Sequence, residues 1–143
     1  EASESILMVE HGPKGGDELN HIVAGRNYGW PAITYGVDCS GVVISPFTEA
    51  EGMEQPMAYW VPSIGPSGLA IYRGELFPEW KGDLLLGSLI NEEMRRLKFH
   101  GDAVVEDEAI VPEIKGRVRD VRVIEDGKIV AVTEEGDVFQ VTR

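Results

Sequence analysis

Short stretches of aliphatic and β-branched residues, separated by turns that contain glycine, fill the second half of this 143-residue chain. Three of the turns carry the dipeptides His100-Gly101, Asp126-Gly127 and Glu135-Gly136. Such dipeptides are typical of hairpins, because glycine adopts the positive φ angles that tight turns require. Around Val121 and Val130, apolar and polar residues alternate in places with the period of a half-buried strand. The pattern therefore predicts an all-β fold.

Candidate strands occupy most of the chain outside one long irregular segment, residues 20–56, which is rich in Gly, Pro, Asp and Ser. Helical periodicity is almost absent. The strands expected from apolar runs between turn residues are 6–9, 57–61, 68–72, 83–88, 94–99, 103–111, 119–124, 128–133 and 137–141.

The strand-and-turn pattern occurs twice, over residues 68–111 and again from Arg119 to the last residue. Each copy is typical of one up-and-down sheet, which is how the blades of a β-propeller follow one another in sequence. The second copy is one strand short, and in propellers a strand from the other end of the chain commonly completes the final blade. A β-sandwich explains the same pattern nearly as well, so periodicity leaves both architectures open.

Composition excludes several classes of protein. The formal net charge is -12, from 25 acidic and 13 basic residues, so the chain repels the phosphates of nucleic acid. Cys39 is the sole cysteine, which excludes an internal disulfide and a zinc site built from several thiolates. The apolar runs are as short as that at residues 84–86, whereas a membrane-spanning helix needs about 20 apolar residues.

Residues 10–20 (EHGPKGGDELN) form a glycine-rich, acidic segment. Its glycines permit backbone conformations that can turn carbonyl oxygens, including those of Gly12 and Pro13, toward a hard cation. Asp17 and Glu18 add carboxylates, the ligand type that calcium prefers. An ordinary β-turn with solvated acids explains the same residues, and both interpretations stay open.

Two further segments combine glycine and proline with aromatic residues. In residues 25–31 (GRNYGWP), we expect Trp30 to fill the core, while Tyr28 either packs or offers a backbone oxygen to a metal. Residues 59–68 (YWVPSIGPSG) can present Ser63 or Ser67 to a cavity. No base lies beside either serine in the sequence and no Gly-x-Ser-x-Gly motif is present, which argues against a serine hydrolase.

Residues 115–120 (KGRVRD) contain two arginines, Arg117 and Arg119, at the spacing that places side chains on the same side of a strand. Two adjacent guanidinium groups in an acidic protein favour a bound anion such as a carboxylate. Ion pairs at the surface with Asp120 or Glu113 are an equally good explanation.

Five segments, in this order, resemble the soluble pyrroloquinoline quinone (PQQ) dependent sugar dehydrogenases, also called glucose/sorbosone or aldose sugar dehydrogenases. They are residues 10–20, 27–31 (NYGWP), 60–68 (WVPSIGPSG), 82–89 (GDLLLGSL) and 117–121 (RVRDV). The resemblance runs along nearly the whole chain and implies a six-bladed β-propeller whose central cleft holds the quinone and a calcium ion. We therefore expect residues 1–143 to form a single partial domain of two to three blades.

The resemblance also implies roles for individual residues in binding the cofactor. The backbone carbonyls of Gly12 and Pro13 match ligands of the calcium ion that the quinone contacts. Arg117 and Arg119 match the arginines that hold the quinone carboxylates, and Ser63 matches a small hydroxyl residue beside the cofactor.

Further matches concern the catalytic base and a second metal site. Asp17 matches an acid that supports the base. Glu18, the Tyr28 carbonyl and Asp38 resemble the ligands of a second, structural calcium ion, with Glu54 as a weaker candidate.

The chain departs from the family pattern at two points. Ile90 stands where many members carry a lysine that contacts the quinone. The catalytic histidine, and an Arg-Asn pair that also grips the quinone, are expected to lie before Glu1. None of His11, His21 and His100 matches that histidine, so we expect the chain alone to be inactive.

The function implied by the resemblance is oxidation of an aldose at its C1 hydroxyl to the lactone, in the periplasm or outside the cell. The partners expected are the sugar and the missing N-terminal half of the protein, or further copies that associate through exposed blade edges. The alternative is a non-catalytic β-domain, derived from the same fold, that binds calcium or a partner.

Overall fold

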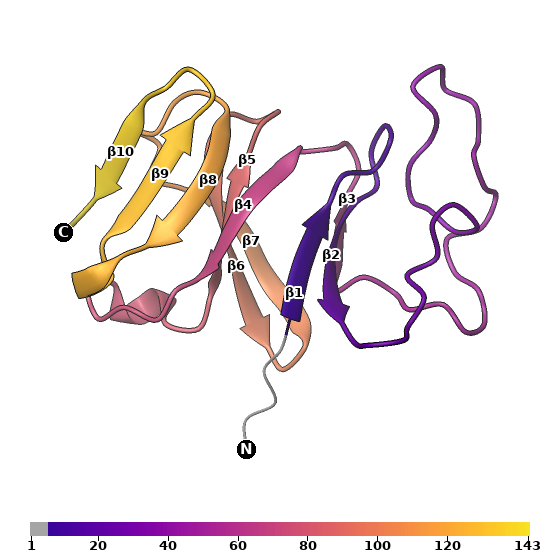
Figure 1. The fold of residues 1–143 in the computed structure, drawn as a ribbon, viewed down its shortest axis with the longest axis horizontal. Coiled ribbons are helices and arrows are strands. Elements are labelled where there is room, and N and C mark those ends of the chain that lie inside the picture. Colours follow the sequence, from indigo (N-terminus) through magenta and orange to yellow (C-terminus); the bar gives the residue numbers. More distant parts are fainter. Residues whose placement is uncertain (1–5) are drawn as a thin grey trace. The chain divides into compact units, whose positions relative to one another are not determined.

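The computed structural model describes residues 6–143, which form β-strands joined by loops and two single-turn 3₁₀ helices. Figure 1 draws the strands as arrows. These residues contain no α-helix, so the predicted all-β class is confirmed. None of their helices is long and apolar enough to cross a membrane. Backbone contacts divide the chain into two compact units, Glu1–Ile64 and Gly65–Arg143, while the single domain stays a prediction.

The first unit contains one antiparallel sheet in the order β1-β2-β3. Its strands are β1 (Ile6–Glu10), β2 (Asp17–Ile22) and β3 (Ala58–Trp60). The sequence predicted β1 and β3 but placed residues 17–20 in a loop. That prediction was wrong because it relied on side-chain propensity, and Asp, Glu and Asn are poor strand formers. Burial of Leu19, with hydrogen bonds that link the buried Asp17 and Asn20 to β1 and the loop after it, favours the strand, which moves the acids Asp17 and Glu18 from a turn into a sheet.

The segment between β2 and β3 has no regular structure apart from turns and bends, as predicted. It packs through Ile33, which is 6% exposed and lies so close to Gly29 that a Cβ there would be 2.1 Å from Ile33 Cγ1. The ring of Tyr35 stacks on that of Tyr59, with centroids 3.7 Å apart. Trp30 is 59% exposed, so the prediction that it fills the core was wrong; Ile33 is the buried side chain of this turn.

The second unit contains two antiparallel sheets, one with four strands and one with three. The four-stranded sheet consists, in spatial order, of β4 (Pro66–Ile71), β5 (Leu84–Ser88), β6 (Glu93–His100) and β7 (Ala103–Ile110). The three-stranded sheet consists of β8 (Val118–Val123), β9 (Ile129–Thr133) and β10 (Val138–Val141). All seven strands agree with the predicted ranges to within two residues at each end, and the second sheet is one strand shorter, as expected.

The core of the second unit is apolar and joins its two sheets. All five residues of β5 are buried, so this strand is covered on both faces. Strands β4 and β5 approach β8 so closely that a Cβ on Gly68 would lie 2.1 Å from Asp120 Oδ1. The hydroxyl of Ser67 donates a hydrogen bond to the Val118 carbonyl at 2.6 Å. The central core residues are Tyr72, Phe77, Leu85, Met94, Ile114, Val118, Val121, Ile129 and Ala131.

The turn between β8 and β9 is tied to this core by Tyr72. Asp126 and Gly127 both have positive φ angles, 67° and 74°, as the dipeptide predicted. The buried Tyr72 hydroxyl donates to the Gly127 carbonyl at 2.8 Å and accepts from the Phe77 N–H at 3.0 Å. One side chain therefore fixes the turn and the segment before the helix η1 (Pro78–Trp80).

Candidate functional site

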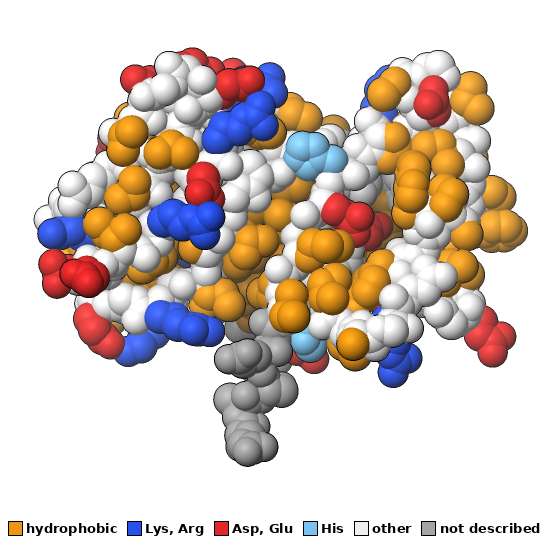
Figure 2. All heavy atoms as spheres, in the orientation of Figure 1, with side chains coloured by type: hydrophobic (Ala, Val, Ile, Leu, Met, Phe, Trp, Pro, Cys, Tyr) orange, Lys and Arg blue, Asp and Glu red, His pale blue; other side chains and the backbone are white. Residues whose placement is uncertain are grey.

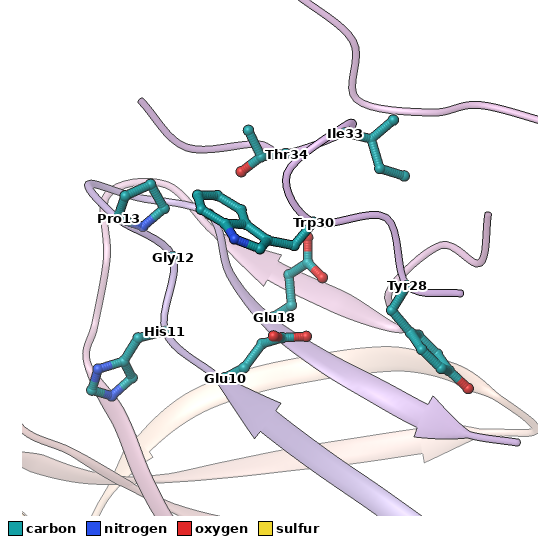
Figure 3. Close-up of a pocket in the computed structure, with 10 residues that line it drawn as sticks. Glu10, His11, Gly12, Pro13, Glu18, Tyr28, Trp30, Ile33 and Thr34 are labelled. Atoms are coloured by element: carbon teal, nitrogen blue, oxygen red, sulfur yellow. The ribbon is translucent and has the colours of Figure 1, made fainter. Parts of the chain in front are cut away.

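A pocket of about 300 Å³ opens in the first unit, where β1 ends and β2 begins (Figure 3). It contains Gly12 and Pro13 of the predicted cation loop together with Glu18 and Tyr28 of the predicted second calcium site. The indole of Trp30 extends toward that loop. The lining residues are Glu10, His11, Gly12, Pro13, Gly16, Glu18, Tyr28, Trp30, Ile33 and Thr34.

The loop between β1 and β2 is compact because its glycines allow close approaches of the backbone. Gly15 and Gly16 have φ angles of 73° and 75°, which favour glycine. A Cβ on Gly12 would lie 2.1 Å from the Gly15 carbonyl oxygen, and one on Gly16 would lie 2.4 Å from the Gly36 nitrogen. The path of this loop therefore depends on residues without side chains, and the Pro13 carbonyl accepts a hydrogen bond from the Cys39 thiol at 3.6 Å.

Hydrogen bonds to the Asp17 side chain hold this loop in place. The side chain is fully buried, and Oδ1 accepts the Gly12 N–H at 2.9 Å. Its Oδ2 accepts the Ser63 hydroxyl at 2.5 Å and the Ile64 N–H at 2.9 Å. One carboxylate thus joins two predicted cofactor-binding positions, Gly12 and Ser63. Support of a catalytic base by Asp17 stays a prediction.

Two carboxylates face each other at the end of the same hairpin. Glu10 and Glu18 are paired in the β1–β2 ladder, and the Asn20 Nδ2 donates to Glu10 Oε1 at 2.8 Å and to Glu18 Oε2 at 3.2 Å. Burial raises the pKa of Glu18, Glu10 raises it further, and the Asn20 hydrogen bond opposes the rise. Asn20 is fully buried, and its Oδ1 has no hydrogen-bond partner within residues 6–143.

Glu10 and Asn20 were not predicted as site residues. Their positions follow from the register of β1 against β2, a strand that the sequence pattern did not predict. Two acids placed symmetrically about the turn at residues 11–16 were the available signal. Carboxylate oxygens and an amide oxygen are all ligands that calcium accepts.

The remaining predicted metal ligands do not line the pocket. Asp38 is exposed, and its Oδ1 accepts hydrogen bonds from the Ser40 N–H at 2.8 Å and the Ser40 hydroxyl at 2.6 Å, which lower the pKa of Asp38. Glu54 forms an ion pair with Arg26 at 3.2 Å. Residues 6–143 contain no group of three or more His, Cys, Asp and Glu side chains that could hold a metal.

In the second unit, Arg117 and Arg119 bind one carboxylate, that of Glu134. Arg117 Nε lies 2.5 Å from Glu134 Oε2, and Arg119 Nη2 lies 3.1 Å from Glu134 Oε1. The hydrogen bond from Arg119, together with the charges of both arginines, lowers the pKa of Glu134. The same-side prediction for the two arginines agrees with this geometry, but their partner is Glu134, while Asp120 pairs with Arg122.

Figure 2 shows basic and acidic side chains interspersed on the visible face of the second unit. Ile90, at the predicted lysine position, follows β5 in a turn and is 59% exposed. In the second unit, both guanidinium groups are thus paired with Glu134, and an exposed isoleucine stands at the predicted lysine position.

Comparisons with known proteins find matches that cover nearly the whole chain. A family model described as "Glucose / Sorbosone dehydrogenase" matches residues 1–140. The aldose sugar dehydrogenase YliI of Escherichia coli (strain K12) is 39% identical over 145 residues, which cover 98% of this chain and 39% of that protein. A crystal structure of a glucose dehydrogenase is 41% identical with a TM-score of 0.89, and the match covers 96% of this chain and 40% of that one.

A more distant structure shares the fold. The PQQ-bound aldose sugar dehydrogenase from Streptomyces coelicolor is 24% identical, with a TM-score of 0.70, and the match covers 99% of this chain and 41% of that one. The chain thus spans about two fifths of the length of these relatives. The likeness confirms the predicted fold class, in which the sheets are blades of a β-propeller.

Proposed function

Because this chain belongs to the glucose/sorbosone dehydrogenase family, we propose that it forms the C-terminal portion of a sugar dehydrogenase that depends on PQQ and calcium. The proposed reaction is oxidation of an aldose at the C1 hydroxyl to the lactone. When bound, the quinone supplies the hydride acceptor and calcium supplies Lewis-acid polarisation. The residues of this chain bind and orient these groups.

The observation that carries the proposal is the pairing of Arg117 and Arg119 on one carboxylate. The two guanidinium groups each take one oxygen of Glu134, so their spacing fits a carboxylate group. PQQ carries several carboxylates. A cofactor of that chemistry is therefore supported by contacts that these arginines already make with a carboxylate of their own chain.

Calcium binding is supported by the pocket of the first unit. The carbonyls of Gly12 and Pro13 are the proposed ligands of the calcium ion beside the quinone. Glu18, the Tyr28 carbonyl and Asp38 remain the proposed ligands of a second ion. The opposed carboxylates and the buried, unpaired Asn20 Oδ1 add Glu10 and Asn20 to the candidates for that ion.

Catalysis needs a general base that the resemblance does not assign to any residue of this chain. General-base catalysis commonly contributes about 100- to 10,000-fold to the rate. We therefore expect residues 1–143 alone to bind ligands with little or no turnover. Asp17 would then act on the base of the whole protein as a supporting acid, while holding Gly12 and Ser63 in this part of it.

A non-catalytic β-domain that binds calcium is the second candidate function, and the Glu10–Glu18–Asn20 contacts favour it. Calorimetry separates the two candidates. Calcium binding without PQQ binding supports the binding domain. Binding of PQQ that is lost in Arg117→Gln, with dye reduction by an aldose once the N-terminal half is supplied, supports the dehydrogenase.

The proposed partners follow from strand edges. Strand β10 pairs with β9 on one side only within the described residues, and its Val138 is 69% exposed. The missing N-terminal half, or a second copy, would cover this edge. Sedimentation that shows only monomer at high concentration would exclude self-association. A periplasmic or extracellular location is part of the same proposal, and fractionation of cells that express the whole protein tests it.

A further inference from the structure

Glu134 occupies the arginine pair in which the proposed function places an anionic cofactor. Each oxygen of its carboxylate contacts a different arginine, Oε2 facing Arg117 Nε at 2.5 Å and Oε1 facing Arg119 Nη2 at 3.1 Å. The side chains of Arg117, Arg119 and Glu134 are 47%, 48% and 43% exposed. The contact is thus open to exchange with a ligand from solution.

The backbone places Glu134 opposite the arginines. Glu134 directly follows β9, and its N–H donates a hydrogen bond to the Arg117 carbonyl at 2.9 Å. The turn beyond it is closed by Thr133, whose N–H donates to the Asp137 carbonyl at 3.0 Å and whose hydroxyl accepts the Asp137 N–H at 3.2 Å. The carboxylate is therefore attached close to its partners and competes with ligands as an intramolecular group.

The net charge of Arg117, Arg119 and Glu134 favours one class of ligand. Two guanidinium groups and one carboxylate leave one net positive charge. A monocarboxylate can only replace one carboxylate by another, against a tethered competitor whose effective concentration is on the order of millimolar. A polycarboxylate can use the remaining positive charge as well as contacts with several carboxylates, and so has more to gain.

We propose that Glu134 determines the specificity of the Arg117–Arg119 pair, excluding monocarboxylates and yielding to polycarboxylates such as PQQ. This inference rests on the proposed function, which assigns an anionic cofactor to the same arginines. It adds that the Glu134 carboxylate occupies the two arginines when no ligand is bound. Removing the Glu134 charge then tightens binding of all carboxylates and tightens it most for the simplest.

The test uses the 143-residue chain labelled with ¹⁵N, and follows the side-chain Nε–H signals of Arg117 and Arg119 by NMR. Acetate and PQQ are titrated separately into the wild type and into Glu134→Gln, which keeps the shape of the side chain. We expect affinity for acetate to rise up to about fivefold in Glu134→Gln, the range for loss of an exposed ion-pair partner, and affinity for PQQ to rise less. Thermal unfolding of each variant checks that it is folded.

The matched control is Glu135→Gln, which makes the same charge change one residue away, at a carboxylate with no ion pair to either arginine in the described structure. Affinities in Glu135→Gln that rise as much as in Glu134→Gln would overturn the inference, as would unchanged affinities in Glu134→Gln. If Arg117→Gln nevertheless loses PQQ, the proposed function survives that failure. If Arg117→Gln binds PQQ as the wild type does, or no protein responds to PQQ, the proposed binding of PQQ by Arg117 and Arg119 is itself wrong.

Discussion

Glu10 and Glu18 are directly opposed in the β1–β2 ladder, and a single amide nitrogen hydrogen-bonds to both carboxylates. Like charges in this position destabilise a sheet. The amide belongs to Asn20, whose oxygen is buried without a partner, so the arrangement leaves polar groups incompletely satisfied. A cation bound between the two carboxylates would offset their repulsion. It would also give the carboxylate oxygens and the buried Asn20 amide oxygen a positively charged partner.

Calcium is therefore expected to raise the thermal midpoint of the chain. A ligand that binds only the folded state at 100 times its Kd contributes about 2.7 kcal/mol of stability. We expect Glu10→Gln and Glu18→Gln to weaken calcium binding at least tenfold by calorimetry, because each removes a carboxylate ligand. Asp38→Asn is the matched comparison. A loss of binding in Asp38→Asn, with none in Glu10→Gln, would support the ligand set inferred from the resemblance and exclude Glu10.

The parts of the fold that could be predicted are those in which local pattern and packing agree. Strands β4 to β10 combine apolar runs with glycine turns, and the structure has all of them. Strand β2 was missed because Asp17 and Asn20 are polar but buried, and only tertiary hydrogen bonds make such burial favourable. Trp30 was misplaced because its size suggested burial, while Ile33 takes the core position.

The candidate site could be predicted only in part, for a related reason. Gly12, Pro13, Glu18 and Tyr28 line one pocket, although the resemblance assigned them to two different calcium sites. Partners that depend on register were not found: Glu10 meets Glu18 across a hairpin, and Glu134 meets the arginines from a different strand end. Spacing in the sequence indicates which side chains share a face, but strand pairing decides which charges meet.

Asp17→Asn should destabilise the first unit far more than removal of one of its partners. The buried carboxylate accepts hydrogen bonds from Gly12, Ser63 and Ile64. An amide in its place turns an N–H toward at least one donor, at a cost of roughly 2 to 4 kcal/mol. Ser63→Ala removes one donor and should cost about 1 kcal/mol. Urea denaturation measures both, and equal costs would show that Asp17 does not anchor the loop.

The ion pairs of Glu134 predict a pH dependence of stability. The arginines lower the pKa of Glu134 below its ordinary value of 4.5, so at moderately acidic pH the unfolded chain binds a proton that the folded chain does not. The stability that Glu134 contributes is therefore present above about pH 4.5 and is lost as the pH falls through its folded pKa. Denaturation of wild type and Glu134→Gln should give curves that converge in acid. A difference that stays constant down to about pH 2 would contradict the lowered pKa.

Arg96 should be the charged residue of the second unit whose loss costs most stability. Its guanidinium is 10% exposed and contacts Asp83 at 2.7 Å, Glu108 at 2.6 Å and Glu106 at 2.9 Å, and the side chain of Asp83 is itself only 8% exposed. Arg96→Met leaves the Asp83 charge buried without its partner, which typically costs roughly 3 to 5 kcal/mol.

A surface pair in the same unit provides the control for Arg96. Arg122 is 69% exposed and pairs with Asp120 at 2.9 Å, so Arg122→Gln should change the free energy of unfolding by less than about 1 kcal/mol. Adding Asp83→Asn to Arg96→Met should recover part of the loss, because it removes the uncompensated charge. Urea denaturation of the four proteins measures these differences. An Arg96→Met variant as stable as Arg122→Gln would mean that Asp83 is solvated in the folded protein, and that the buried ion pair does not hold β5 and β6 together.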